Sequence, residues 1–152
     1  MKRRHFLTTL TASAAVTALP ALAVTALPLV EVFKRPTCGC CGAWVDHLKA
    51  AGFPVKVTEV GDTTVTRKRY GLKDKFGSCH TGIVSGYVVE GHVPAAEVKR
   101  LLATKPAAIG LSVPGMPVGS PGMEYGDRED PFDVFLIDKS GRSTVFAHYP
   151  KS

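Results

Sequence analysis

Hydrophobic and polar positions alternate along part of the chain and follow a helical spacing along other parts. Residues 29–33 (LVEVF) and 55–60 (VKVTEV) read as β-strands. Between them, apolar residues of the segment 44–51 recur at helical spacing. A second helix is predicted over residues 62–70, with Asp62 as its N-cap. The pattern of the first half is therefore strand, helix, strand, helix.

The second half of the pattern predicts further strands and one more helix. Residues 81–93 contain two short runs, TGIVSG and YVVEGHV, which are typical of two strands folded back on each other. Pro94 is predicted as the first residue of a helix, PAAEVKRLL. Residues 109–126 are rich in glycine and proline, which predicts a long loop, and residues 133–149 predict a C-terminal β-hairpin. This order predicts a single α/β domain, thioredoxin-like, with an added Gly/Pro/Met loop and a C-terminal hairpin.

The first 23 residues have the features of an export signal. Lys2, Arg3 and Arg4 precede an apolar stretch that ends in Ala21-Leu22-Ala23, an A-x-A cleavage signal. The order Lys-Arg-Arg-His-Phe-Leu is similar to a twin-arginine signal. We therefore expect cleavage near Ala23, a mature domain over residues 24–152 without a stable membrane span, and a periplasmic location. An uncleaved anchor is the alternative.

Composition and charge limit the classes of function. The chain has 152 residues, of which 45% are hydrophobic, and this suits one globular domain with a modest core. Half of the net charge of +6 lies on Lys2, Arg3 and Arg4 and would leave with the leader. The remainder argues against a nucleic-acid partner. The basic run Arg67-Lys68-Arg69 is predicted to be a solvated helix face.

Four cysteines are the main candidates for chemistry. Cys38, Cys40 and Cys41 occupy three of four consecutive positions, at a predicted junction between a strand and a helix. A helix N-terminus favours thiolates and lowers the pKa of a thiol. Cys79 precedes the next predicted strand, and a thioredoxin-like fold would place it opposite the other three cysteines.

Several chemistries fit four such thiols. Cys38 and Cys41 have the C-x-x-C spacing of a redox dithiol, so a thiol–disulfide oxidoreductase is one alternative. Structural disulfides, pairing Cys38 with Cys41 and Cys40 with Cys79, are another. Zinc is a third, although adjacent cysteines make a regular tetrahedron awkward. Copper, as Cu(I), fits best, because this soft ion prefers thiolates, and crowded thiolates can bridge more than one ion.

Other side chains are candidates for additional ligands or for groups that tune the site. Pro-Gly-Met occurs twice in the predicted loop and places Met116 and Met123 there, and thioether sulfur is also a soft ligand. His80 follows Cys79 directly, and His92 lies in the run EGHVP. The remaining residues singled out are expected to be structural: Trp44 in the core or site wall, His47 and His148 at the surface.

The runs PTCGCCGAWVDHL, SCHTGIVSGYVVEGHVPAAEVKRLL and GLSVPGMPVGSPGME resemble the CopG-type copper-resistance family of bacterial periplasmic proteins. The resemblance covers nearly all of the predicted mature chain. It implies a thioredoxin-like fold whose cysteines, here Cys38, Cys40, Cys41 and Cys79, hold copper. It also implies other periplasmic copper-handling proteins as partners and a role in interconverting Cu(I) and Cu(II).

Overall fold

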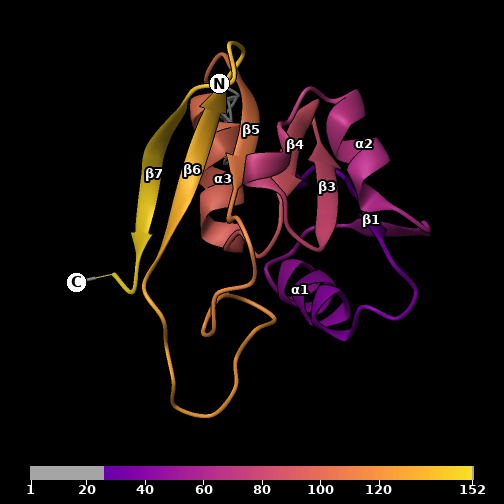
Figure 1. The fold of residues 1–152 in the computed structure, drawn as a ribbon, viewed down its shortest axis with the longest axis vertical. Helices are drawn as coiled ribbons and strands as arrows, with labels where there is room; N and C mark the ends of the chain where they lie inside the picture. The colour runs from indigo at the N-terminus through magenta and orange to yellow at the C-terminus, as the bar shows by residue number, and fades with distance from the viewer. Residues whose placement is uncertain (1–25, 152) are drawn as a thin grey trace, which may run out of the picture.

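The computed structural model describes residues 26–151, which form one mixed α/β domain around a seven-stranded sheet (Figure 1). The leader predicted for residues 1–23 lies outside the described residues. The elements follow in the order β1 (Val30–Lys34), α1 (Gly39–Ala50), β2 (Val55–Glu59), α2 (Thr63–Arg69), a 3₁₀ turn η1 (Asp74–Phe76), β3 (His80–Val84), β4 (Tyr87–Glu90), α3 (Ala95–Thr104), β5 (Ala108–Ser112), β6 (Phe132–Asp138) and β7 (Ser143–Tyr149).

The strands lie in the order β2-β1-β3-β4-β5-β6-β7. Strands β1 and β2 are parallel, β3 runs antiparallel to β1 and to β4, and β5 runs parallel to β4. The hairpin β6–β7 extends the sheet antiparallel beyond β5. The end of β1 therefore lies beside the start of β3, since Lys34 pairs with His80.

Both faces of the sheet are covered, and strand alternation divides the core between them. The larger cluster joins Trp44 and Leu48 of α1 and Leu101 of α3 to sheet residues such as Val32 and Val89. The smaller cluster lies on the opposite face and contains Leu72, Phe76, Ile83, Val88 and Ile137. Helices α1 and α3 thus share one face, and the chain around η1 covers part of the other.

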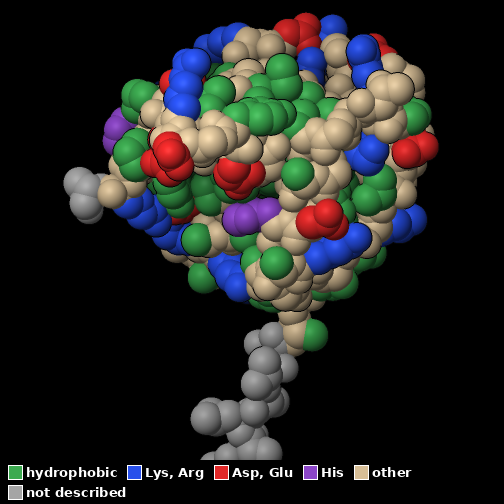
Figure 2. Space-filling view, turned by 90° about the horizontal axis from the view of Figure 1, so that it is seen from below, with side chains coloured by type: hydrophobic (Ala, Val, Ile, Leu, Met, Phe, Trp, Pro, Cys, Tyr) green, Lys and Arg blue, Asp and Glu red, His purple; other side chains and the backbone are tan. Residues whose placement is uncertain are grey.

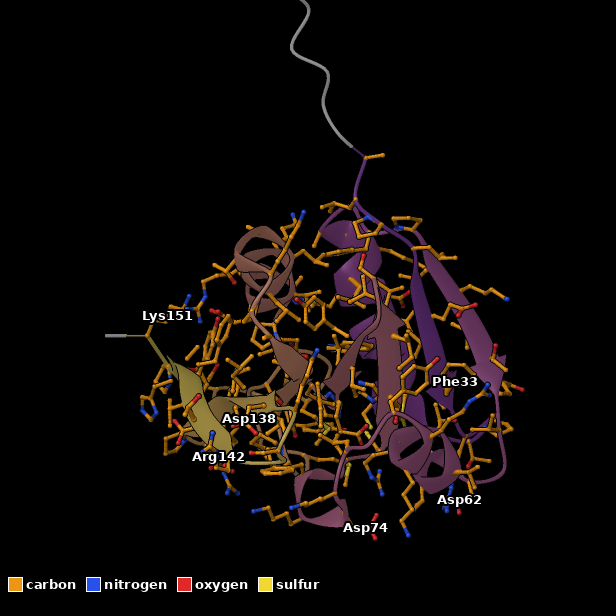
Figure 3. The ribbon with its side chains drawn as sticks, turned by 90° about the horizontal axis from the view of Figure 1, so that it is seen from above. Phe33, Asp62, Asp74, Asp138, Arg142 and Lys151 are labelled. Carbon is orange, nitrogen blue, oxygen red and sulfur yellow. A yellow bond between two sulfur atoms is a disulfide. The ribbon has the colours of Figure 1, made fainter. Side chains whose placement is uncertain are left out.

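The predicted starts of the second and third helices hold to within a residue, whereas α1 begins at Gly39, before the apolar run predicted over 44–51. The Asp62 carboxylate accepts the amide N–H of Thr64 at 2.8 Å, so Asp62 is the predicted N-cap of α2. Asp62 lies at the edge of the molecule in Figure 3. Pro94, predicted as the first helical residue, is instead the N-cap of α3, with an extended backbone.

The prediction of an uninterrupted loop over residues 109–126 was wrong at its start. Residues 109–112 belong to β5, which lies between β4 and β6. Gly110 lets this strand pack closely, because a Cβ there would collide with the Val88 carbonyl of β4. The run is short and broken by glycine, so its hydrophobic pattern alone did not identify it.

The predicted C-terminal hairpin is present as β6 and β7. Its turn is held by Asp138, whose carboxylate accepts the amide N–H groups of Ser140 and Arg142 at 2.8 and 3.0 Å. Asp138 and Arg142 lie side by side at this turn in Figure 3, and their side chains meet at 2.9 Å. Over residues 26–151, no helix has the length and apolar character needed to cross a membrane.

Candidate metal centre

Three cysteines cluster at the N-terminus of α1. Cys38 is the N-cap residue, and Cys40 and Cys41 lie in the first turn. Cys38 and Cys41 form a disulfide, whereas Cys40 carries a free thiol with its sulfur 3.6 Å from that of Cys38. Cys41 is fully buried, and the other two are half-buried. The C-x-x-C pair predicted as a redox dithiol is therefore joined in this structure.

Cys79 comes from a different part of the chain and meets the α1 cysteines. It directly precedes β3, which pairs with β1, and β1 leads into the cysteine segment. Its sulfur lies 3.8 Å from the sulfur of Cys40, and its carbonyl oxygen lies 3.7 Å from the sulfur of Cys41. The sheet pairing therefore places the fourth cysteine opposite the other three, as the sequence predicted.

Two buried histidines contact Cys79. Its sulfur lies 3.2 Å from Nδ1 of His80 and 3.2 Å from Nε2 of His92. The two rings lie edge to face, with centroids 4.9 Å apart, and the His80 ring also packs against Trp44. Both imidazoles are fully buried. Trp44 is buried as well and forms a wall of the site, as predicted.

The hydrogen bonds of His92 fix which of its nitrogens faces the cysteines. Nδ1 lies 2.8 Å from the carbonyl oxygen of Pro121, and a carbonyl can only accept, so Nδ1 carries the proton. In the neutral ring, Nε2 therefore presents a bare lone pair to Cys79. Burial lowers the pKa of His92, which favours this neutral form.

Burial also keeps Cys79 and His80 uncharged. Desolvation, followed by the neighbouring Cys40, raises the pKa of the Cys79 thiol to about 12. Desolvation, followed by His92, lowers the pKa of His80 to about 3. Among the described residues, Nε2 of His80 is a buried nitrogen without a hydrogen-bond partner. Cys79 is thus protonated beside neutral imidazoles, and a bound cation would displace the thiol proton.

The Gly/Pro/Met loop closes over the cysteine segment. Gly122 packs so closely on α1 that a Cβ there would lie 2.8 Å from the Cys40 carbonyl oxygen and 2.7 Å from the backbone nitrogen of Trp44. Met123, the next residue, is 9% exposed, whereas Met116 is 52% exposed. The structure therefore brings the Met123 end of the loop to the site and leaves the Met116 side chain largely in solvent.

The two histidines expected at the surface differ. His148 is exposed and lies 2.7 Å from Asp133. His47 is half-buried, and its Nε2 accepts the amide N–H of Ala95 at 3.0 Å at the start of α3. The surface prediction for His47 was therefore incomplete, because this ring caps a helix that has no side-chain cap at Pro94.

The prediction that Arg67 belongs to a solvated helix face was wrong. Arg67 is 7% exposed, and its guanidinium contacts the fully buried Glu90 at 2.8 Å. Burial raises the pKa of Glu90 above its usual range, and hydrogen bonds from Thr81 and Ser78 and the charge of Arg67 only partly offset this rise. Sequence reasoning missed this pair, since a lone glutamate at the end of a strand gives no signal of its buried partner.

The donor set suits a soft metal ion. The sulfurs of Cys38, Cys40, Cys41 and Cys79 all lie within 4.8 Å of one another, as do the Cys79 sulfur and the ring nitrogens of His80 and His92. Cys79 belongs to both groups. Thiolate sulfur and imidazole nitrogen are ligands of copper and zinc rather than of hard cations.

Figure 2 views the face on which α1 and the long loop lie, and shows acidic and basic side chains interspersed over it.

The fold and this site define a small α/β protein with a cysteine cluster that could bind a metal ion. Two solved structures, both named copper resistance protein CopG (forms 1 and 2), are similar to it, each with a TM-score of 0.78. In both cases the identity is 44%, and the match covers 82% of this chain and 99% of the other. The chain belongs to the CopG copper-resistance family, as its sequence motifs indicated.

A family model described as protein of unknown function, DUF411, matches residues 76–123. This part contains Cys79, both buried histidines and the two loop methionines, but not the cysteine segment of α1. No curated protein matches the chain.

Proposed function

We propose that this protein holds Cu(I) in a cluster of cysteine thiolates formed by Cys38, Cys40, Cys41 and Cys79, in the service of copper resistance and homeostasis. The observation that carries the proposal is the convergence of four sulfurs, from two distant chain segments, within 4.8 Å. Cu(I) accepts low coordination numbers and prefers thiolates. Because crowded thiolates can bridge two ions, more than one copper ion per chain is expected.

Full use of the cluster requires reduction of the Cys38–Cys41 disulfide. With the disulfide closed, Cys40 and Cys79 are the free thiols of the chain. Two electrons and two protons convert it to two thiols, and deprotonation of these supplies two further sulfur ligands. Copper capacity should therefore follow the thiol count of the sample.

His80, His92, Met116 and Met123 are the proposed additional ligands or tuning groups. His92 has the strongest support, because the Pro121 carbonyl fixes the tautomer that presents Nε2 to Cys79. Met116 has the weakest, given its exposure. Zinc remains a less suitable cargo, since adjacent Cys40 and Cys41 do not favour a regular tetrahedron.

The proposal extends to the fold family, location and partners. We infer a thioredoxin-like domain, supported by the sheet order β2-β1-β3-β4, the parallel β1–β2 pair and the cysteines at the start of α1. We further infer export to the periplasm with removal of residues 1–23, supported by the charged start and the A-x-A signal. Copper ions and other periplasmic copper-handling proteins are the proposed partners.

A second candidate function is thiol–disulfide oxidoreductase activity through Cys38 and Cys41. The disulfide between them favours it, as does the buried position of Cys41 behind the half-buried Cys38. A copper-linked redox role, interconverting Cu(I) and Cu(II), would combine both functions. Cys40 separates the candidates, because a dithiol enzyme does not need it.

The test is an anaerobic titration of the fully reduced protein with Cu(I), in competition with a chromophoric Cu(I) chelator. Bound copper per chain and free thiols are measured on the same samples. More than one tightly bound copper, with all four thiols protected from alkylation, is the expected result. Weak binding with four reactive thiols would overturn the proposal.

The variant Cys40→Ser assigns the function. The cluster predicts a loss of copper capacity in this variant, whereas an oxidoreductase predicts unchanged cycling of the Cys38–Cys41 disulfide against a dithiol reductant. Cys40→Ser with full copper capacity would argue against a cluster that uses Cys40.

A further inference from the structure

We propose that Glu90 is a positioning residue for the metal centre: its buried carboxylate holds the Ser78 backbone amide and the Thr81 side-chain hydroxyl, on either side of Cys79, and so sets where the Cys79 sulfur points. This inference rests on the proposed copper binding and goes beyond it, because Glu90 touches none of the four sulfurs in the contacts of the structure.

The carboxylate of Glu90 accepts hydrogen bonds from residues on both sides of Cys79. Oε1 accepts the amide N–H of Ser78 at 2.8 Å, and Oε2 accepts the hydroxyl of Thr81 at 2.6 Å. Ser78 precedes Cys79, and Thr81 lies two residues after it. Hydrogen bonds to a carboxylate are stronger than neutral ones, so a fully buried Glu90 holds this segment firmly.

Arg67 makes this burial of a carboxylate energetically acceptable. Its Nη1 donates to Glu90 Oε1 at 2.8 Å, and both side chains are buried. An unpaired charge at this depth would be strongly unfavourable. Gly77 makes room for the guanidinium, because a Cβ at this position would lie 2.8 Å from Arg67 Cζ. The pair thus ties α2 to the end of β4, directly beneath the Cys79 segment.

The neighbouring glycine completes the fit. Gly91 has a φ of +72°, and a Cβ on it would lie 2.6 Å from the Ser78 side-chain oxygen. Ser78 fills that space and donates its hydroxyl hydrogen to the Gly115 carbonyl of the Gly/Pro/Met loop. The run Glu90-Gly91-His92 therefore faces Ser78-Cys79-His80, with the glutamate holding the backbone and His92 contacting the sulfur.

A second buried glutamate shows what a purely structural pair looks like in this protein. Glu97 is 1% exposed and bonds to Arg100 at 2.7 Å, to the Tyr149 hydroxyl at 2.8 Å and to Lys151 at 2.9 Å. These partners lie at the C-terminal hairpin and on α3, and none belongs to the cysteine cluster. Glu97 is therefore the matched control for Glu90.

The test replaces each ion pair by apolar side chains of similar size, which often preserves folding. One variant carries Arg67→Met with Glu90→Leu, and the control carries Arg100→Met with Glu97→Leu. For both, the melting temperature of the metal-free protein, the Cu(I) affinity and the thiolate-to-copper absorption in the ultraviolet are measured. We expect the Glu90 variant to lose about 10- to 100-fold in Cu(I) affinity, with altered absorption, while the control binds like the parent.

Each outcome decides between the two proposals. A parent protein that binds no copper overturns the proposed function itself. A parent that binds copper, with a folded Glu90 variant of unchanged affinity and absorption, overturns the positioning role alone. Equal losses in the two variants do the same, because they would reflect general stability.

If the double variant does not fold, Glu90→Gln and Glu97→Gln replace it. Glutamine keeps one carbonyl acceptor and loses the charge. The two variants are compared at temperatures equally far below their melting points. The positioning role predicts that Glu90→Gln then loses more Cu(I) affinity than Glu97→Gln. No difference between them contradicts it.

Discussion

The two segments that form the candidate metal centre are organised in opposite ways. The α1 segment, residues 38–41, brings three sulfurs together through local helix geometry. The β3–β4 segment, residues 78–92, contributes one sulfur and two imidazoles that meet through strand pairing and buried hydrogen bonds. The α1 segment is compact in sequence, and two of its three cysteines are partly exposed to solvent. The β3–β4 segment is spread over a longer stretch of sequence, and both of its imidazoles are fully buried.

This difference separates two tasks within one site. The local cluster supplies the sulfurs whose redox state can change, since the disulfide lies there. The β3–β4 segment supplies Cys79, which belongs to both groups of potential ligands, in a surrounding that Glu90, Pro121 and the sheet hold in place. A change in the β3–β4 segment should therefore affect the metal more than a comparable change elsewhere.

The largest effect is expected from Cys79→Ser. The substitution removes the sulfur shared by both groups of potential ligands. Cu(I) affinity should therefore fall by more than about 100-fold, which exceeds the loss expected for residues outside the ligand set. Chelator competition measures the affinity, and the melting temperature of the metal-free variant checks its fold. A folded Cys79→Ser protein with the parent's affinity would show that the α1 segment binds copper alone.

A smaller loss is expected from His92→Phe, with His47→Gln as its control. His92→Phe removes the nitrogen 3.2 Å from the Cys79 sulfur and should cost about 10- to 100-fold in Cu(I) affinity. His47→Gln removes a ring that accepts a backbone N–H on α3, so it should cost about 1 kcal/mol of stability and leave copper binding unchanged. Equal copper affinities in the two variants would contradict the distinction.

The β3–β4 segment should also make the metal-free fold sensitive to acid. The pKa of His80 is about 3 in the folded protein, below its ordinary value of 6.5, so between these values the unfolded chain binds the extra proton. Stability is then fully present above pH 6.5 and is lost as the pH falls toward 3. From pH 7 to pH 5 the loss should be about 2 kcal/mol.

Urea denaturation at pH 5, 6 and 7 measures this loss. His80→Gln should flatten the dependence, and His148→Gln, which removes an exposed imidazole, should not. The same slope in the parent and in His80→Gln would assign the acid sensitivity to other groups.

The smallest effects are expected in the loop. Replacing Met by Leu preserves volume, so stability should change by less than about 1.5 kcal/mol. Met123→Leu should reduce Cu(I) affinity more than Met116→Leu, because Met123 is buried next to Gly122, which packs on α1. Chelator competition on the two variants gives the order of their Cu(I) affinities. A larger loss in Met116→Leu would contradict a role for the buried Met123 side chain in copper binding.

Much of this arrangement is predictable from the sequence because the signals are local. Hydrophobic periodicity and Asp62 locate the first two helices, and the spacing of Cys38, Cys40 and Cys41 places them at a helix start. The approach of Cys79 follows once β3 is paired with β1. The helix features depend on residues close together in sequence. The position of Cys79 depends on the predicted strand order, which leaves few possible partners for β3.

The parts that escaped prediction depend on tertiary contacts. Strand β5 is short and owes its place to the fit of Gly110 against Val88, which no periodicity reports. Arg67 looks like one of three surface cations until Glu90 is seen beneath it. His47 likewise reveals its partner only when α1 and α3 are packed together.

Cys40 and Cys79 are 39 residues apart in the chain, so a copper ion bound to both would act as a cross-link between distant segments. An ion shared by these two sulfurs would cross-link the chain and enclose β2, α2 and η1 in a closed loop, as a covalent staple would. The cross-link would lower the conformational entropy of the unfolded chain, and copper that binds only the folded protein would further increase its free energy of unfolding. Resistance to proteases would in that case rise and fall with the copper supply, so the abundance of the protein would itself register how much copper surrounds it.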